Sequence, residues 1–200
     1  RGVYSHFAAA NPAHQKFTEQ QFQKLQEAAW FIKVKCQMFN VKCHIAATGA
    51  TLLDKKYHLD AVRIGLGLYG YYPYGGQMLK PALSWRSLIS EIKNIPAGEG
   101  IGYDLTEILS RTTKVAIMPI GYWHGLPRLL SSVGRVNVNG QMSKVLGRIC
   151  MDITMIDVTD IPCQIGDLIK IELLDVAQKT NSSIYEILTR INPLIHRKVV

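Results

Sequence analysis

The sequence lacks three features that would each have pointed to a particular class of protein. No apolar run is long enough to cross a bilayer, which excludes a transmembrane segment. None of the four cysteines forms a Cys-x-x-Cys pair, so we expect no metal site and free thiols in a reducing cytoplasm. The net charge is +8, but the basic residues are dispersed, so we expect no binding to nucleic acid.

The first residues also lack the marks of a protein start. The segment RGVYSHFAAAN has neither an initial methionine nor an apolar region before a cleavage site, so we expect that it is not a signal peptide. We expect it to be the interior of a longer protein. With 48% hydrophobic and 19% charged residues, the composition is that of an ordinary globular protein.

The first third of the chain alternates strand and helix patterns. Apolar residues at helical spacing predict a helix over residues 18–35, with Thr18 as its N-cap, and a shorter helix over residues 50–56. Three short β-prone runs predict strands: residues 2–8, 43–47 and 62–69. This alternation predicts parallel strands in an α/β unit.

The pattern changes at YYPYGGQMLKP (residues 71–81), a Pro/Gly-rich connector, and we place a domain boundary between residues 76 and 77. Short β-prone runs follow, including residues 84–92 and 167–173, and Asn139-Gly140 predicts a two-residue hairpin turn. A last helix is expected over residues 183–190. Frequent short strands predict a small all-β barrel or sandwich, so the fold class is α/β plus all-β.

Six motifs follow one another along the chain in this order: SHFAAAN, HIAATGAT, VRIGLGLYG, GEGIGYD, PIGYWHG and GRICMD. Their order and spacing resemble the alanine racemases, a family of fold-type III pyridoxal-phosphate enzymes. The resemblance covers nearly the whole chain. It implies the C-terminal part of a TIM (β/α)8 barrel over residues 1–76 and a small β-barrel-like domain over residues 77–200.

The resemblance also implies an activity. The family interconverts L- and D-alanine through a Schiff base with pyridoxal 5'-phosphate, using a lysine and a tyrosine as two bases, and supplies D-alanine for peptidoglycan in the bacterial cytoplasm. Tyr103 matches that tyrosine. A phenol is a poor base until nearby cations stabilise its anion. The partners implied are a small amino acid substrate and a second subunit, in a homodimer whose active site is shared across the interface, with no membrane contact.

Five residues match cofactor-binding positions of the family. Arg63 matches an arginine that faces the pyridine nitrogen and keeps it unprotonated. Thr48 takes the place of a phosphate-binding serine, and the backbone amides of Gly65 and Leu66 match positions that meet the same phosphate. His6 matches a histidine near the ring that hydrogen-bonds to the arginine.

Four further residues match substrate-binding positions. Cys150, Met151 and Asp152 belong to a loop that enters the partner's site, where the Met151 amide helps to hold the substrate carboxylate. Cys150 is not expected to act as a nucleophile, because no base is placed beside it. Tyr122 matches a tyrosine that lines the substrate entrance.

The chain departs from the family pattern at three places. Ala47 replaces an asparagine near the phosphate, and Trp123-His124 replaces an Ala-Asp pair at the entrance. Asn192 falls where the family has a tyrosine near the substrate methyl. An asparagine leaves room for a hydroxymethyl group and can hydrogen-bond to it. We therefore hypothesise that serine is accepted beside alanine.

No lysine of this chain lies in the family's Schiff-base context. The resemblance implies that this lysine lies on an upstream strand, and that the 200-residue polypeptide alone is inactive and binds the cofactor weakly or not at all. Alternatives are a serine or broad-specificity racemase, a non-catalytic pyridoxal-phosphate carrier, a β-domain interaction module, and a decarboxylase of the same fold type. The decarboxylases meet the pyridine nitrogen with an acid, the opposite charge to Arg63.

Overall fold

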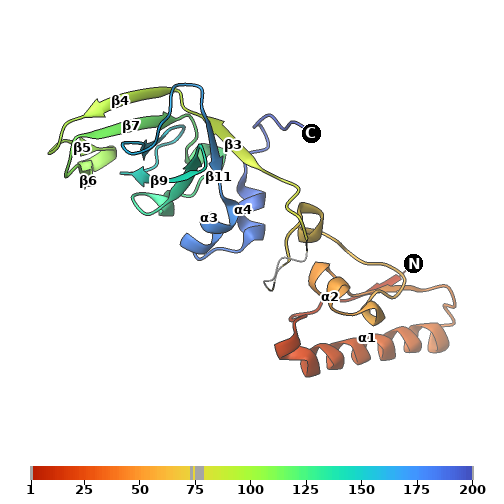
Figure 1. Ribbon diagram of the computed structural model, residues 1–200. Helices are drawn as coiled ribbons and strands as arrows, with labels where there is room; N and C mark the ends of the chain where they lie inside the picture. The colour runs from red at the N-terminus through yellow and green to blue at the C-terminus, as the bar shows by residue number, and fades with distance from the viewer. Residues whose placement is uncertain (1, 73, 75–78, 200) are drawn as a thin grey trace. The chain divides into compact units, whose positions relative to one another are not determined.

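The computed structural model describes residues 2–72, 74 and 79–199. The chain divides into two compact units, an N-terminal unit, Arg1–Leu83, and a C-terminal unit, Ser84–Val200 (Figure 1). The boundary expected between residues 76 and 77 falls on residues outside the described part. In that part, no helix has the length and apolar character needed to cross a membrane.

The N-terminal unit is built on two parallel strands. Strand β1 (Gly2–Tyr4) pairs with β2 (Lys42–His44), with Val3 opposite Cys43, and helix α1 (Gln15–Lys35) connects them. A parallel pair requires such a crossover connection. Helix α2 (Thr48–Leu53) follows β2, and a parallel bridge then joins Ala47 to Arg63. The expected α/β class is confirmed here, whereas the assignment of this unit to the C-terminal part of a TIM barrel remains a prediction.

Helix α1 packs through residues at helical spacing. Phe22 and Leu25 are buried in a cluster with Phe7, Ile45 and Tyr57. Clusters of this kind supply most of a helix's stability in a protein.

Thr18 does not cap α1, as the sequence suggested. Asn11 caps a short 3-10 turn at Pro12–His14, and α1 begins directly after that turn. The Thr18 side chain is fully buried, and its hydroxyl donates to the carbonyl of Ala9 at 2.6 Å. The turn therefore sets the start of the helix, and Thr18 anchors the helix to the preceding loop.

The strand expected over residues 62–69 is largely wrong. Only Arg63 forms a bridge, and Leu66–Tyr69 is a 3-10 helix. Gly70, with φ +79°, follows this helix in the left-handed region and donates its amide to the Gly67 carbonyl. Glycines offer no side chains for strand packing and permit this tight turn.

The C-terminal unit holds a seven-stranded antiparallel sheet in the order β3-β11-β8-β9-β10-β7-β4. The sheet curls into a half-barrel, with a separate β5–β6 hairpin near one end of β4 and β7 (Figure 1). The strand bounds are β3 Trp85–Leu88, β4 Glu91–Ile95, β5 Gly100–Ile101, β6 Glu107–Ile108, β7 Thr113–Met118, β8 Arg135–Val138, β9 Gln141–Leu146, β10 Thr154–Asp157 and β11 Leu168–Ile171. The expected all-β domain is confirmed in its curled form.

The turn expected at Asn139-Gly140 joins β8 to β9. Both residues have positive φ, +49° and +85°, as a type I′ turn requires. The Gly140 amide also donates to the Asn137 side chain at 2.9 Å.

Two short helices follow the sheet. Helix α4 (Ile184–Arg190) begins after Ser183, whose hydroxyl accepts the Glu186 amide, close to the expected bounds. Helix α3 (Leu173–Lys179) was missed, because LLDVAQK continues the apolar run of β11 without a turn signal.

Candidate active site

The ends of β1 and β2 and the Ala47–Arg63 bridge meet at the guanidinium of Arg63. Its Nη2 donates to the Ser5 carbonyl at 2.9 Å, to Nδ1 of His6 at 3.0 Å and to the Ile45 carbonyl at 3.1 Å. Its Nη1 donates to Nδ1 of His44. Parallel strands present their carboxyl ends at one edge, which explains why residues far apart in sequence meet here.

These contacts show which nitrogen of each histidine ring faces Arg63. The guanidinium lies against Nδ1 of both His6 and His44. The described hydrogen-bond contacts of Arg63 are thus carbonyl oxygens and imidazole nitrogens, with no carboxylate among them. The guanidinium carbon also lies 5.8 Å from the centre of the Tyr4 ring, which stacks on His44.

His44 belongs to this site but was not selected from the sequence. It is the first residue of the HIAATGAT motif, and its position at the end of β2, parallel to β1, could have indicated it. A histidine at a strand end is more often structural, and the contact with Arg63 and the stacking on Tyr4 distinguish this one.

Thr48 organises the turn that follows Arg63. Its side chain is 1% exposed, and its hydroxyl oxygen accepts the amides of Gly65 at 3.2 Å and Gly67 at 3.1 Å. A Cβ on Gly67 would lie 3.0 Å from Thr48 Cγ2 and 3.1 Å from Ile64 Cγ2. The structure therefore brings together Thr48, Gly65 and the buried Leu66, as the sequence suggested, with the Gly65 amide directed at the threonine oxygen.

In the C-terminal unit, Tyr103 lies in the tight turn between β5 and β6. Gly102 (φ +77°) precedes it, and Asp104 (φ +60°) follows it. The Tyr103 side chain is 69% exposed. Asp104 forms an ion pair with Arg148 at 2.9 Å. The phenol thus projects from a turn that is held at both sides.

The loop at Cys150–Met151 is paired with the segment that carries Tyr122. The Tyr122 amide donates to the Cys150 carbonyl at 3.0 Å, and the Trp123 amide donates to the Met151 carbonyl at 2.8 Å. A Cβ on Gly121 would lie 2.2 Å from the Cys150 carbonyl oxygen, so the two segments touch through their backbones.

The side chains of this loop differ in exposure. Met151 and Asp152 are exposed, whereas Cys150 is buried. Burial, and then the charge of Asp152, raise the pKa of the Cys150 thiol. A thiol with a raised pKa is a weak nucleophile, in agreement with the expectation for Cys150.

Asn192 joins the same surface through its own hydrogen bonds. Its Nδ2 donates to the Trp123 carbonyl at 3.0 Å, and its backbone amide donates to the His124 carbonyl at 3.1 Å. Its Oδ1 accepts the Leu194 amide at 2.9 Å. The amide group of Asn192 therefore already bonds to the chain on both sides.

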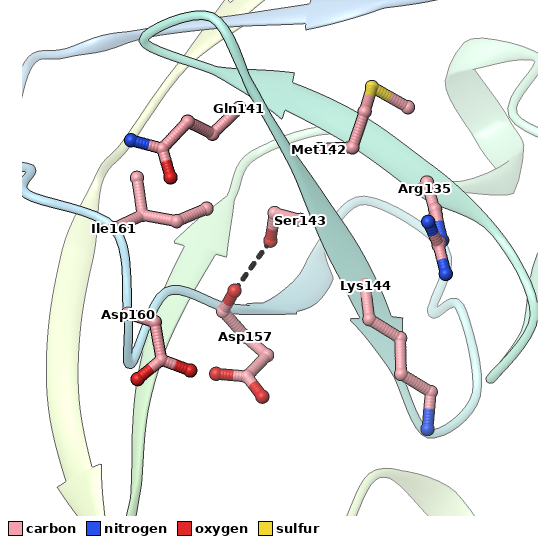
Figure 2. Close-up of a pocket in the computed structure, with 8 residues that line it drawn as sticks. All are labelled: Arg135, Gln141, Met142, Ser143, Lys144, Asp157, Asp160 and Ile161. Atoms are coloured by element: carbon pink, nitrogen blue, oxygen red, sulfur yellow. Dashed lines mark hydrogen bonds between the residues drawn. The ribbon is translucent and has the colours of Figure 1, made fainter.

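A separate polar groove of about 500 Å³ lies on the β sheet, away from these residues. Figure 2 shows Asp157 and Asp160 on one side of it and Arg135 and Lys144 on the other. The Ser143 hydroxyl donates to the Asp157 carbonyl at 2.7 Å across the groove. None of the residues selected from the sequence lines it.

Comparisons with known proteins agree on one family. The model of the alanine racemase N-terminal domain matches residues 1–73, and that of the alanine racemase C-terminal domain matches residues 82–199. An alanine racemase of Leptospira interrogans is 38% identical over 100% of this chain and 57% of its own length. One of Halothermothrix orenii is 34% identical over 98% of this chain and 55% of its own length.

Solved structures give the same result. An alanine racemase of Bartonella henselae with covalently bound pyridoxal phosphate has a TM-score of 0.82 and 29% identity, covering 95% of this chain and 54% of its own. One of Clostridium difficile in complex with cycloserine has a TM-score of 0.85 and 29% identity, covering 96% of this chain and 54% of its own. The chain spans a little over half the length of the relatives it matches. Two family models cover it almost from end to end, and the chain belongs to the alanine racemase family.

Proposed function

We propose that this chain contributes the cofactor-ring contact, the phosphate contacts and one of the two catalytic bases of a pyridoxal-phosphate-dependent alanine racemase. The observation that carries the proposal is the surroundings of Arg63. Its guanidinium is held by carbonyl oxygens and by ring nitrogens of His6 and His44, with no carboxylate among its described contacts. Its positive charge therefore stays available to a ligand.

These residues fit the cofactor. A pyridine nitrogen is a neutral acceptor, and a guanidinium fixed beside it disfavours its protonation. Arg63 would hold that nitrogen, and His6 would lie beside the ring. Thr48 would hold the phosphate by donating its hydroxyl hydrogen, since its oxygen already accepts the Gly65 and Gly67 amides, and the turn at Gly65 and Leu66 would lie beside the phosphate. Pyridoxal phosphate, when bound, withdraws electrons from the substrate α-carbon and makes its proton removable.

Tyr103 is the base that this chain would supply. Racemisation removes the α-proton from one face and returns a proton to the other, which two bases on opposite faces do directly. The exposure of Tyr103 supports this role, because the phenol is free to meet a substrate. The Met151 amide would bind the substrate carboxylate, with Tyr122 at the entrance.

We further propose that the site is shared between two subunits. One subunit supplies the Arg63 region, and its partner supplies Tyr103 and Met151. Exposed apolar side chains on the hairpin and the neighbouring loop support an interface there: Tyr103, Leu105, Ile108, Met151 and Ile153. Exposed apolar patches often mark interaction surfaces. The product, D-alanine, would supply cell-wall synthesis in the cytoplasm.

The test uses a chimera in which the part of the Leptospira relative that this chain does not match precedes the chain. The chimera should interconvert L- and D-alanine when pyridoxal phosphate is added. Tyr103→Phe should lower kcat by about 10²- to 10⁴-fold, the usual contribution of a positioned base. A fall of less than threefold would remove Tyr103 from the mechanism.

Mixed dimers test the shared site. Subunits carrying Arg63→Ala and subunits carrying Tyr103→Phe should each be inactive. Together they should recover about a quarter of the activity, because half of the random dimers contain one site with both residues intact. No recovery from a mixture shown to exchange subunits would place both residues of a site in one subunit.

A further inference from the structure

The carboxylate of Glu107 lies beneath the hairpin that carries Tyr103. Glu107 is the first residue of β6 and pairs with Ile101 of β5, which directly precedes Gly102 and Tyr103. Its side chain is only 14% exposed. A charged group this buried requires compensating partners.

Those partners come from two other segments of the C-terminal unit. Oε2 accepts the Gly147 amide and the Ser132 hydroxyl, each at 2.7 Å, and Oε1 forms an ion pair with the Lys144 ammonium. The Ser132 amide in turn donates to the Gly147 carbonyl at 3.1 Å. Glu107 therefore joins β6 to the end of β9 and to the loop before β8.

Gly147 and Arg148 form the floor on which the hairpin rests. A Cβ on Gly147 would lie 2.5 Å from the Ile101 carbonyl oxygen, and a Cβ on Gly102 would lie 2.9 Å from the Arg148 amide nitrogen. This floor continues directly into Cys150 and Met151. Any movement of Gly147 would therefore displace both Tyr103 and the Met151 loop.

We propose that Glu107 is a positioning residue for the reaction: by holding Gly147 from β6, it fixes the Tyr103 turn against the loop that carries Met151. The role rests on the proposed function, because it has a catalytic consequence only if Tyr103 is the base. Among the hydrogen bonds of the described residues, no other one joins a buried side chain of the hairpin to the floor at Gly147 and Arg148. The Asp104–Arg148 ion pair is exposed, and exposed pairs contribute little.

The position requires a carboxylate. One oxygen accepts two hydrogen bonds while the other faces a cation, a pattern that an acceptor-only, negatively charged group satisfies completely. A glutamine side chain has one oxygen and one NH2 group. Its NH2 donor would therefore face either the Gly147 amide or the Lys144 ammonium, which are donors themselves. Glu107→Gln therefore keeps size but removes the charge and weakens the bracing. Glu91→Gln is its matched control, because Glu91 is exposed and its ion pair among the described residues is with Lys93.

The first measurement is amide hydrogen exchange by NMR in the full 200-residue chain. Glu107→Gln should speed exchange at Gly147 about tenfold or more, the factor for losing a charge-assisted hydrogen bond, and should increase backbone motion at residues 102–105. Glu91→Gln should change neither. Faster exchange at Gly147 with an unchanged hairpin would overturn the proposal, as would no change at Gly147.

The second measurement is the kinetics of the chimera. Glu107→Gln should lower kcat about tenfold or more with KM within twofold, because Tyr103 is misplaced while substrate binding persists. Lys144→Met, which spares both bonds to Oε2, should retain most of kcat. An equal loss in both variants, or none in Glu107→Gln, would overturn the positioning role.

Two outcomes separate this inference from the proposed function. If Tyr103→Phe leaves kcat unchanged, the proposed function fails, and the exchange data still report on the bracing. If Glu107→Gln does not fold, Ser132→Ala removes one of the donors and should increase motion at residues 102–105 to a smaller extent. An unchanged hairpin in Ser132→Ala would then overturn the proposal.

Discussion

Arg63 donates to Nδ1 of His6 at 3.0 Å, although the two residues are 57 positions apart in the sequence. Its Nη2 has two hydrogens and three acceptors, so at least one hydrogen is shared. The guanidinium is thus fixed from several directions, and its planar, forked shape is what these acceptors need.

Arg63→Lys in the chimera should lower kcat by about tenfold to a hundredfold, because an ammonium cannot make the forked set of hydrogen bonds and each such bond to a charged group contributes about 1.5–3 kcal/mol. Arg190→Lys is the control, since the ion pair of Arg190 among the described residues is an exposed one with Glu186 within α4. Steady-state rates in both directions measure the effect. If kcat stays within threefold of the parent, the precise geometry of Arg63 is unimportant.

Gly102→Ala should impair the Tyr103 turn, and Gly98→Ala provides a control at another glycine with positive φ. Both glycines have positive φ, +77° and +88°. A Cβ on Gly102 would meet the Arg148 amide nitrogen at 2.9 Å, whereas a Cβ on Gly98 would meet nothing within 4 Å.

We expect both variants to lose about 1 kcal/mol of unfolding free energy to strain, and Gly102→Ala to lose more. Only Gly102→Ala should also lose racemase activity in the chimera. Urea denaturation measures the loss of unfolding free energy, and kcat measures the loss of activity. Equal losses of both quantities in the two variants would show that the Tyr103 turn tolerates displacement.

Asn192→Tyr should shift substrate preference from serine towards alanine. A tyrosine ring fills the space that a hydroxymethyl group would need and removes the asparagine amide. The measurement is the ratio of kcat/KM for serine to that for alanine in the chimera. An unchanged ratio would reject the specificity hypothesis and leave Asn192 with the structural role given by its bonds to Trp123 and Leu194.

The stability contributed by Glu107 should depend on pH. Burial by itself raises the pKa of Glu107, but hydrogen bonds from Gly147, Lys144 and Ser132 outweigh it and lower that pKa below its ordinary value of 4.5. A carboxyl with a lowered folded-state pKa stabilises the protein above its unfolded-state value and loses that effect as the pH falls through the folded-state value.

The difference in unfolding free energy between the parent chain and Glu107→Gln should therefore be constant near pH 7. It should begin to shrink below about pH 4.5, the ordinary carboxyl range. Urea denaturation from pH 7 to pH 3, with Glu91→Gln as the reference, measures it. A difference that stays constant or grows on acidification would contradict the assignment of Glu107 as a buried carboxylate.

Local signals were sufficient where the conformation depends on adjacent residues. Asn139-Gly140 determines its own turn, because both positions need positive φ, and Ser183 determines the start of α4. The strand over residues 62–69 was predicted wrongly because its apolar pattern belongs to a 3-10 turn, in which Leu66 is buried whereas Leu68 and Tyr69 are exposed.

The candidate site was predictable only through motifs that carry family resemblance. Nothing local indicates that His44 and Arg63 touch, since their contact depends on the register of parallel strands. Glu107 was equally invisible, because a glutamate between Thr106 and Ile108 looks like a solvent-facing residue of a short strand. Its three partners come from segments 25 to 40 residues away.

The guanidinium of Arg63 has no carboxylate among its described contacts, and this has an effect at longer range. Its positive charge produces an electrostatic field in the solution around the strand ends. This field attracts a diffusing phosphorylated molecule before the molecule reaches the protein. Dissolved ions weaken such attraction over about 10 Å at 0.1 M. Capture of a phosphate-bearing ligand should accordingly slow as salt is added, even though the bound complex itself changes little.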